Sequence, residues 1–324
     1  MKAVLLRKHG GPEVLEYSEL SIPEPGYDQV RVRLKAIGVN TRDAYIRAGI
    51  YNRELPVILG IEGAGVVDAV GPGVTGWAAG DRVAYYVADI LGAYSEYQVV
   101  PKTKLVKLPA ELSYQDAASM FDHGLTAHYL TTSTFPLGKG HRVLIQAAAG
   151  SIGRLLIQLA KRFGATVYGT VSTPEKADLI KKIGADEAII YRDTDVAKAV
   201  SALTDGKGVH VVYDSVGKDT IQGSVRSLAK RGTLVLYGAI SGPVPTIIPM
   251  ELADAGSLFF TRPHLAHHIA TQEELNQRSQ DIFSWFLQGE ISLNLDKVYP
   301  LSDVAEAHRR LDDKSNTGKM ILVP

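Results

Sequence analysis

The stretch that decides the fold of this chain runs from Arg142-Val-Leu-Ile-Gln146 through Ala147-Ala-Ala-Gly-Ser-Ile-Gly153 into Arg154-Leu-Leu-Ile-Gln-Leu-Ala-Lys-Arg-Phe163. It predicts a buried strand, then a tight turn of small residues, then a helix. Apolar residues recur in the helix at the spacing of one face, namely Ile152, Leu155, Leu156, Leu159 and Phe163. Gly164 is expected at the position that ends the helix.

A helix that starts directly after such a turn can bind a pyrophosphate, because unpaired backbone N–H groups and the positive end of the helix dipole meet the anion. The G-x-G-x-x-G pattern survives as Ala148-x-Gly150-x-x-Gly153, with its first glycine replaced. Alone, this motif fits a structural turn nearly as well. With the flanking strand and helix it indicates a dinucleotide site. We expect Gly150, Ser151, Ile152 and Gly153 to bind the phosphates.

From His141 onward, apolar strands alternate with helical stretches, which is typical of βαβ units in a parallel sheet. Several strands are rich in β-branched residues with little alternation, as expected when helices cover both faces. The six predicted strands, the complement of a doubly wound dinucleotide-binding fold, are Arg142–Gln146, Thr166–Val171, Glu187–Tyr191, Val209–Asp214, Thr233–Tyr237 and Ser257–Thr261.

Residues 1 to about 120 have a different pattern, in which short strands are separated by glycine- and proline-rich turns. Val30–Leu34 alternates apolar and polar residues as a half-buried strand does. We expect a compact, barrel-like β domain here. In the tail, Asp281–Gln288 and Ser302–Leu311 look helical, the second after a serine cap, and Lys319–Val323 looks like a final strand.

Composition excludes several functions. The formal net charge is zero, the sequence pI is about 7.1 and there are no cysteines. Disulfides, thiol nucleophiles and cysteine-ligated zinc are therefore ruled out. A neutral chain argues against nucleic acid as a partner. Neither a signal segment nor an apolar run of about 18 residues is visible, so we expect a cytoplasmic protein outside the membrane.

The end of the second strand of the parallel sheet predicts which dinucleotide is bound. NAD enzymes usually place an acid there to accept from the ribose 2′-OH. This chain has Val171-Ser-Thr-Pro-Glu-Lys176 instead. Ser172 and Thr173 can donate to a 2′-phosphate and Lys176 can neutralise it, provided that Glu175 points away. Thr173-Pro174 also reads as an ordinary helix start. We favour NADP over NAD.

The whole chain resembles the medium-chain dehydrogenase/reductase family, and within it the zinc-free NADPH:quinone oxidoreductases related to zeta-crystallin. Besides Ala147–Gly153, the resemblance rests on segments spread along the chain: His9-Gly-Gly-Pro-Glu-Val-Leu15, Ala36-Ile-Gly-Val-Asn40, Tyr45-Ile-Arg-Ala-Gly49 with Tyr51, Gly60-Ile-Glu-Gly-Ala-Gly65, Gly80-Asp-Arg-Val83, Gly124-Leu-Thr-Ala127, Val212-Tyr-Asp-Ser-Val-Gly217, Thr261-Arg-Pro263 and Gly318-Lys-Met-Ile-Leu322.

This resemblance implies an α/β protein with two domains. A GroES-like β-barrel domain would comprise residues 1–121 and 267–324, and a Rossmann domain with a doubly wound parallel sheet would comprise residues 122–266. The resemblance further implies an active cleft between the domains and a homodimer.

Departures from the zinc branch of the family predict that no metal is bound. Zinc alcohol dehydrogenases carry cysteine at Asn40 or its neighbour and histidine where this chain has Ile61, whose side chain cannot ligate a metal. Three histidines lie close together in sequence, at His264, His267 and His268, but no Asp or Glu lies near them in sequence. We expect solvated or capping roles for them rather than metal binding.

The resemblance also places the residues of the site. Asn40, Asp43, Tyr45 and Tyr51 would line the catalytic centre, where the tyrosines could stack on a flat ring and donate to its oxygen. Without the resemblance, each tyrosine would read equally well as a surface aromatic. Further cofactor contacts are expected at Thr126, Tyr129, Tyr191, Ser215, Gly238 and Lys319. An exposed lysine on an edge strand is the equal alternative for Lys319. Asp122 and His123 are expected to make local hydrogen bonds.

Together these observations predict an NADPH-dependent reductase that passes reducing equivalents to a quinone without a metal. Quinones and enones accept hydride readily, so positioning would dominate catalysis. An NADPH-dependent enone or alkenal reductase is the nearest alternative. A non-catalytic NADPH-binding protein, structural or RNA-binding, is the alternative from another class.

Overall fold

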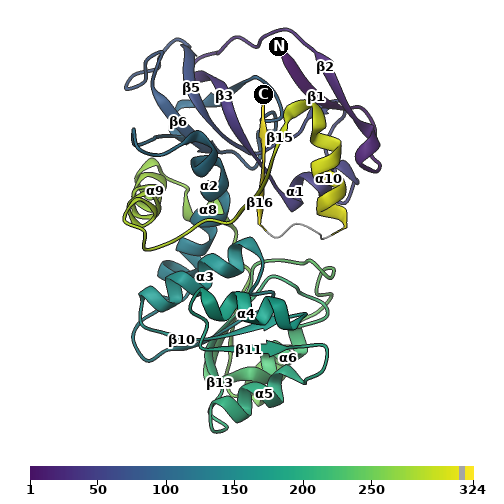
Figure 1. The fold of residues 1–324 in the computed structure, drawn as a ribbon, viewed down its shortest axis with the longest axis vertical. Coiled ribbons are helices and arrows are strands. Elements are labelled where there is room, and N and C mark those ends of the chain that lie inside the picture. The colour runs from purple at the N-terminus through teal and green to yellow at the C-terminus, as the bar shows by residue number, and fades with distance from the viewer. Residues whose placement is uncertain (314–317) are drawn as a thin grey trace. The chain divides into compact units, whose positions relative to one another are not determined.

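The computed structural model describes residues 1–313 and 318–324, and its chain divides into two compact units (Figure 1). The first unit comprises Met1–Leu125, Ile269–Gln288 and Leu293–Pro324. The second comprises Thr126–His268 and Gly289–Ser292. The domain limits given above stay a prediction.

The second unit is built on a six-stranded sheet with the order β11-β10-β9-β12-β13-β14, in which all neighbouring strands are parallel. This confirms the predicted doubly wound sheet. The central strands are buried almost throughout, as the lack of alternation predicted. The strand bounds are β9 Arg142–Ile145, β10 Thr166–Val171, β11 Glu187–Ile190, β12 Val209–Asp214, β13 Leu228–Leu236 and β14 Phe259–Thr261.

Helices connect these strands and cover the sheet. Helices α3 and α4 pack on β9 to β11, whereas α6 packs on β12 and β13 and lies beside α5, as Figure 1 shows. Their bounds are α3 Ser151–Arg162, α4 Pro174–Lys182, α5 Val196–Leu203, α6 Ile221–Ser227, α7 Pro249–Asp254 and α8 Leu265–His268. A π-helical turn spans Leu130–Thr134. Gly164 has φ +78° directly after α3, which confirms its predicted position.

Two strand starts of this sheet differ from the sequence prediction. Strand β13 begins at Leu228 rather than Thr233, because Leu228 already pairs with Val209 ahead of a register shift. Strand β14 begins at Phe259 rather than Ser257, because Ser257 has φ +56° and this left-handed conformation does not continue a strand.

The first unit contains a large curved sheet and a small one. The large sheet has the order β15-β16-β3-β5-β6-β8, with β7 also paired to β3, and the small sheet has the order β2-β1-β4. Strand β3 buries Val30, Val32 and Leu34 in alternation with Arg31 and Arg33, as predicted. The bounds are β1 Lys2–Leu6, β2 Leu15–Glu19, β3 Gln29–Val39, β4 Val57–Ile58, β5 Glu62–Val70, β6 Arg82–Tyr86, β7 Tyr97–Pro101, β8 Leu105–Lys107, β15 Leu295–Pro300 and β16 Lys319–Val323.

The C-terminal segment belongs to the core of this first unit. Strand β16 lies between β15 and β3 in the large sheet (Figure 1). Its residues Met320 and Leu322 are buried in one hydrophobic cluster with Val4 and Val32. The first and last strands of the chain are therefore buried in the same core. Local sequence patterns did not predict this.

Helices of the first unit correct two expectations. Helix α9 spans Gln272–Leu287 and not only Asp281–Gln288, because Thr271 and Glu274 form a capping box at its start. Helix α10 spans Val304–Asp312 after a short 3₁₀ turn, and the serine cap is wrong: the Ser302 hydroxyl donates to Asp303 Oδ1 instead of capping the helix. The remaining helices are α1 Thr41–Arg47 and α2 Tyr114–Tyr129, with 3₁₀ turns at Pro12–Val14, Lys102–Lys104 and Leu301–Asp303.

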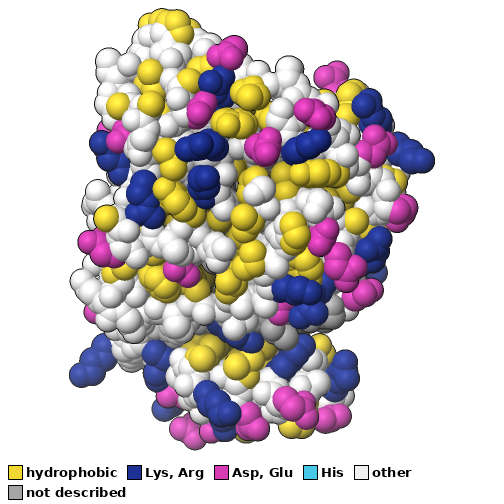
Figure 2. Space-filling view, turned by 45° about the horizontal axis from the view of Figure 1, so that its top comes forward, with side chains coloured by type: hydrophobic (Ala, Val, Ile, Leu, Met, Phe, Trp, Pro, Cys, Tyr) yellow, Lys and Arg dark blue, Asp and Glu magenta, His cyan; other side chains and the backbone are white. Residues whose placement is uncertain are grey.

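The exterior bears on possible partners. On the face drawn in Figure 2, basic and acidic side chains are interspersed, so this face carries no broad basic surface of the kind that binds a phosphate backbone. Within the described residues, no helix combines the length and apolar character that a bilayer crossing requires.

Candidate functional site

The phosphate loop of the second unit has an uncapped helix start. Strand β9 leads through Ala147, which has φ +52°, to Gly150 at the N-cap of α3. No side chain caps this helix and its first turn holds no acid. By contrast, Thr173 caps α4. The backbone N–H groups that begin α3 are therefore available to an anion, as a pyrophosphate site requires.

Three glycines explain how this loop is packed. A Cβ built on Gly153 would lie 2.7 Å from both the Ala147 and Ala148 carbonyl oxygens, so α3 approaches the loop too closely for any side chain. A Cβ on Gly150 meets only the Ala147 oxygen, at 3.3 Å, which leaves room for a ligand. A Cβ on Gly169 would lie 2.7 Å from the Ala148 methyl. The glycine at 169 thus gives space to the alanine that replaces the first motif glycine.

The structure brings four other predicted cofactor residues of this unit to one edge of the sheet. Ser172, Tyr191, Ser215 and Gly238 follow β10, β11, β12 and β13, whose carboxyl ends flank the end of β9. The Tyr191 backbone N–H donates to the Val171 carbonyl at 3.1 Å. A Cβ on Gly238 would collide with the Ser215 backbone, so a glycine is required there.

The loop after β10 holds the residues predicted to contact a 2′-phosphate. Thr173 accepts from the Lys176 backbone N–H at 3.4 Å, as an N-cap does, and the Lys176 side chain is exposed. The NADP prediction requires Glu175 to point away from the phosphate. A hydrogen bond from Thr173 lowers the pKa of the Glu175 carboxyl, so that carboxylate lies beside Thr173. The contacts of Ser172, Thr173 and Lys176 with a 2′-phosphate stay predictions.

A buried hydrogen-bond network that the sequence analysis missed supports the phosphate loop. Asp214 accepts from the Ser224 hydroxyl at 2.7 Å, and that hydroxyl accepts from Gln146 Nε2 at 3.0 Å. Gln146 Oε1 accepts from Thr170, whose hydroxyl accepts from the Ala147 N–H at 3.2 Å. Gln146 directly follows the buried strand β9 and Asp214 ends β12, so a polar residue at the close of an apolar run was the available signal.

Thr126 and Tyr129 lie in the last turn of α2 and are buried. The Tyr129 ring stacks on His268, with centroids 4.2 Å apart and planes at 7°. His264 Nδ1 accepts from the Ala266 N–H at 3.3 Å, in line with the capping role expected for these histidines. The roles of Thr126 and Tyr129 toward a cofactor stay predictions.

The first unit holds a buried polar centre around Asn40. Asn40 Nδ2 donates to Glu62 Oε1 at 2.8 Å, and the Lys319 ammonium donates to Asn40 Oδ1 and Glu62 Oε1, at 2.5 Å each. All three side chains are at most 4% exposed. The alternative that Lys319 is an exposed edge-strand lysine is wrong, because β16 is an inner strand. Its role as a cofactor contact stays a prediction.

Glu62 is the residue of this centre that sequence reasoning overlooked. Its other oxygen accepts from the Asp122 N–H at 2.8 Å, so the carboxylate joins β5 to α2. The signal was a single charged residue inside the glycine-rich run Gly60–Gly65, since a charge in such a strand needs a buried partner.

The local hydrogen bonds expected of Asp122 and His123 are wrong, because both residues contact the distant Glu62 and Lys319 instead, and this centre perturbs the pKa of both. Burial, together with the Glu62 charge, raises the pKa of Asp122. Burial and then the Lys319 charge hold the pKa of His123 well below its usual range, so its ring is neutral. Its Nε2 lies 3.5 Å from the Lys319 ammonium and its Nδ1 is buried without a partner.

The remaining predicted residues lie in helix α1 or in the turn that follows it. Asp43 is fully buried, and its Oδ2 accepts from the Asn40 N–H at 2.9 Å. Burial raises the pKa of Asp43 to about 7, against the effect of its hydrogen bonds. Tyr45 is half-buried and meets the exposed ring of Tyr51 edge-on at 5.5 Å. Arg42 lies over the Tyr51 ring, 6.0 Å from its centroid.

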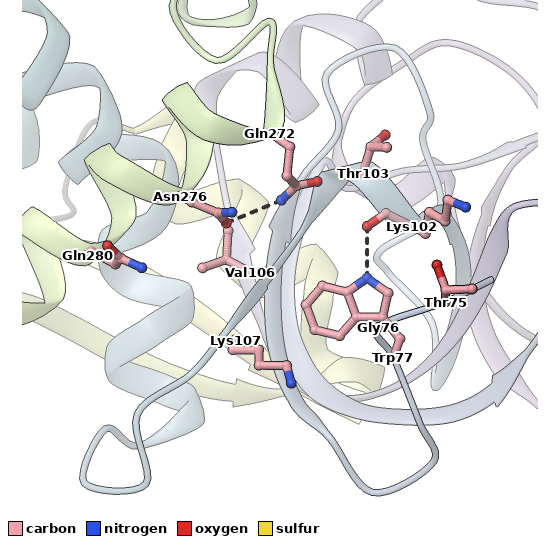
Figure 3. A pocket seen from close by; sticks show the side chains of 10 residues that line it. All are labelled: Thr75, Gly76, Trp77, Lys102, Thr103, Val106, Lys107, Gln272, Asn276 and Gln280. Atoms are coloured by element: carbon pink, nitrogen blue, oxygen red, sulfur yellow. Dashed lines mark hydrogen bonds between the residues drawn. The ribbon is translucent and has the colours of Figure 1, made fainter.

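A separate hollow in the first unit, with a volume of about 420 Å³, contains none of the predicted site residues (Figure 3). Gln272, Asn276 and Gln280 line it from α9, and the Trp77 indole faces it from a loop. The indole N–H donates to the Lys102 carbonyl at 3.1 Å, so that polar group is already satisfied.

A parallel sheet of dinucleotide-binding type joined to a curved β unit is the architecture of medium-chain dehydrogenases/reductases. Comparison with known families agrees. Residues 26–110 match the model described as "Alcohol dehydrogenase GroES-like domain", and residues 151–284 match "Zinc-binding dehydrogenase". Among the described residues, no group of three or more His, Asp or Glu side chains is placed to hold a metal ion.

Individual relatives narrow the class. The chain is 44% identical to a quinone oxidoreductase of Pseudomonas aeruginosa, over 100% of this chain and 99% of that protein. It is 41% identical to a 2-haloacrylate reductase of a Burkholderia species, over 99% and 98%. The structure of Escherichia coli quinone oxidoreductase complexed with NADPH superposes with a TM-score of 0.96 at 41% identity, covering all of both chains. The chain belongs to the quinone oxidoreductase family.

Proposed function

We propose that this chain reduces quinones with NADPH and without a metal. The observation that carries the proposal is the uncapped start of α3 beside Gly150 and Gly153, in a chain that matches quinone oxidoreductases over its full length. That loop provides the donors and the space that a pyrophosphate needs.

The residues of the second unit bind and orient the cofactor in this proposal. Ser151, Ile152 and Gly153 contribute backbone N–H groups to the pyrophosphate, and Ser172 and Lys176 contact the 2′-phosphate. Tyr191 lies on the adenosine side, where its backbone is fixed to the end of β10. When bound, NADPH supplies the reducing equivalents. The protein's contribution is orientation and electrostatics.

The residues of the first unit act on the acceptor. Tyr51 offers an exposed ring to a flat substrate, and Tyr45 supports that ring edge-on. The Asn40 side chain is held by Glu62 and Lys319, so its amide cannot turn freely. The Lys319 ammonium, whose charge the Glu62 carboxylate compensates, acts by holding the Asn40 amide in one orientation toward the acceptor.

Enone reduction is the second candidate, because a relative at 41% identity is described as a 2-haloacrylate reductase. Such a substrate is an activated alkene that carries a carboxylate. The same cofactor site serves both acceptors, and only the shape of the acceptor site would separate them.

The proposal is tested by NADPH oxidation with chelator-treated protein. We would compare 1,4-benzoquinone, 9,10-phenanthrenequinone, a simple enone and 2-chloroacrylate, with NADH in parallel. We expect the fastest turnover with a quinone and NADPH. Faster turnover of the enone or the haloacrylate would favour the second candidate. Tight NADPH binding without turnover of any acceptor would instead indicate a non-catalytic NADPH-binding protein.

Charge substitutions after β10 should change the cofactor preference in opposite directions. Lys176→Ala removes the cation and should raise the Kd for NADPH about tenfold, whereas Glu175→Gln removes the opposing charge and should lower it. Neither change should alter NADH binding noticeably, since NADH lacks the 2′-phosphate. Fluorescence titration measures all four constants. Equal effects on both cofactors would show that these residues do not read the phosphate.

We also propose that the chain forms a homodimer in the cytoplasm. Strand β14 ends the parallel sheet, and its Phe259 is 62% exposed. Exposed apolar edges of this kind favour pairing with another copy. Phe259→Asp should therefore give monomers in sedimentation velocity, whereas Leu203→Asp, at a different exposed apolar residue of this unit, should not. An unchanged assembly state in Phe259→Asp would place the interface elsewhere. Fractionation of the source cells tests the location.

A further inference from the structure

A hydrogen-bonded array of buried polar side chains lies in the first unit. It runs from Asp43 in α1 through Tyr94 to His308 in α10 and returns to α1 at Arg47. Asp43 Oδ2 is 3.0 Å from the Tyr94 hydroxyl, and that hydroxyl is 3.0 Å from His308 Nε2. His308 Nδ1 is 2.9 Å from Arg47 Nη1. These four side chains are all at most 4% exposed. Burial of so many polar groups is costly unless each one is paired.

The hydrogen-bond donors and acceptors of this array have only one consistent assignment. A guanidinium only donates, so His308 Nδ1 must accept from Arg47. The proton of the neutral ring is then on Nε2, which donates to the Tyr94 oxygen. The Tyr94 hydroxyl in turn donates to Asp43. Burial, and then the neighbouring Arg47 charge, lowers the pKa of His308 to about 3, which agrees with a neutral ring.

Both ends of this array, Arg47 and Asp43, make further hydrogen bonds. Arg47 Nη2 donates to both oxygens of Asp312, at 3.0 and 2.7 Å, and its Nε donates to the Gly10 carbonyl. At the other end, the oxygen of Asp43 that accepts from Tyr94 also accepts from the Asn40 N–H at 2.9 Å. Helix α10 and the start of α1 are thus connected through side chains alone.

Asn40 is the residue on which this array and the Glu62–Lys319 centre converge. Its backbone is fixed by Asp43, and its side chain is fixed by Glu62 and Lys319. A shift of the Asp43 carboxylate would therefore move the amide group that the proposed function assigns to the reaction. The mechanism above uses neither Tyr94 nor His308.

We propose that Asp43, Tyr94, His308 and Arg47 form a hydrogen-bond array with a single direction that holds Asn40 in place for quinone reduction, with Tyr94 and His308 as positioning residues. The inference rests on the proposed function, because it assigns the array to that reaction.

The array has a predictable dependence on pH. The groups that face Asp43 are Tyr94, the Asn40 N–H and Lys319, which favour the carboxylate, and Glu62 and Asp122, which oppose it. Asp43 Oδ1 is buried without a partner, so a proton can bind there. Protonation of Asp43 weakens the bonds from Asn40 and Tyr94, so activity should fall as the pH falls through about 7.

Tyr94→Phe tests this inference, since it removes one hydroxyl and keeps the ring that packs against His308. We expect kcat for the quinone to fall about tenfold with the Kd for NADPH unchanged. The acidic limb of the pH profile should move to higher pH, because Asp43 loses a hydrogen bond that lowers its pKa.

The matched control is Tyr85→Phe. Tyr85 is another fully buried tyrosine of this unit, and its hydroxyl donates to Gln98, away from the array. We expect a similar loss of stability from this variant but no shift of the pH profile. If Tyr94→Phe leaves kcat and the profile as they are in Tyr85→Phe, the positioning role is wrong.

The direction of the array is tested without activity. In ¹⁵N-histidine-labelled protein, long-range ¹H–¹⁵N spectra should show His308 as the neutral Nε2–H tautomer throughout the neutral range, assigned by its loss in His308→Gln. An Nδ1–H tautomer or a charged ring would overturn the array. If the wild-type chain reduces no acceptor, the proposed function and the positioning role fail together, and the spectrum still decides whether the array exists.

Discussion

Gly153→Ala should destabilise the second unit and abolish NADPH binding. The added methyl would lie 2.7 Å from the Ala147 and Ala148 carbonyl oxygens, so α3 must move away from the loop. Overpacking of this kind costs about 2–3 kcal/mol, and the melting temperature of this unit should fall by roughly 5–10 °C. The same displacement would move the N–H groups that the phosphates need. Thermal melts and NADPH titration measure the two effects.

Two other glycine-to-alanine variants separate packing from binding. Gly150 has φ −71°, which alanine also adopts, and an added Cβ would lie 3.3 Å from the Ala147 carbonyl oxygen. The fold of Gly150→Ala should therefore remain stable while its methyl occupies the ligand's space. We expect an unchanged melting temperature and an NADPH Kd raised at least about tenfold, or 1.4 kcal/mol. Gly223→Ala, in α6 with nothing within 4 Å, should alter neither adversely. Tight NADPH binding by Gly150→Ala would show that the phosphates do not bind at this loop.

Lys319→Met should be the most destabilising change in the first unit. It leaves the Glu62 carboxylate, which is fully buried, without the cation 2.5 Å away. Removing one partner of a buried ion pair costs about 3–5 kcal/mol, because the remaining charge is uncompensated. Asn40 also loses the donor to its Oδ1. We therefore expect reduced stability in urea denaturation together with loss of quinone reduction.

The double variant Lys319→Met with Glu62→Gln distinguishes the charge from the packing. It removes both charges, so we expect it to regain most of the stability that Lys319→Met loses. Activity should not return, since the donor that holds Asn40 Oδ1 is still missing. If the double variant is as unstable as Lys319→Met, the loss comes from packing of the lysine stem rather than from an unpaired carboxylate.

Local patterns predicted much of this protein. The six parallel strands, the helix from Ser151 and the glycine that ends it follow from period, β-branching and turn chemistry, which act between residues close in sequence. The glycine-rich loop and the missing acid after β10 indicated a phosphate-binding edge, because each is set by one strand and the helix that follows it. The capping box of Thr271 and Glu274 is equally local, and it sets the start of α9.

Tertiary structure alone decided the rest, because it brings together residues far apart in sequence. Lys319 became a buried partner of Asn40 and Glu62 only because β16 pairs with β3, and nothing local in the last strand indicates that pairing. His308 and Tyr94 are likewise far apart in sequence, and only the folded structure brings them into contact. Sequence periodicity reports which face of an element is buried. Only the packing of distant elements decides which polar groups share that burial and how they are charged.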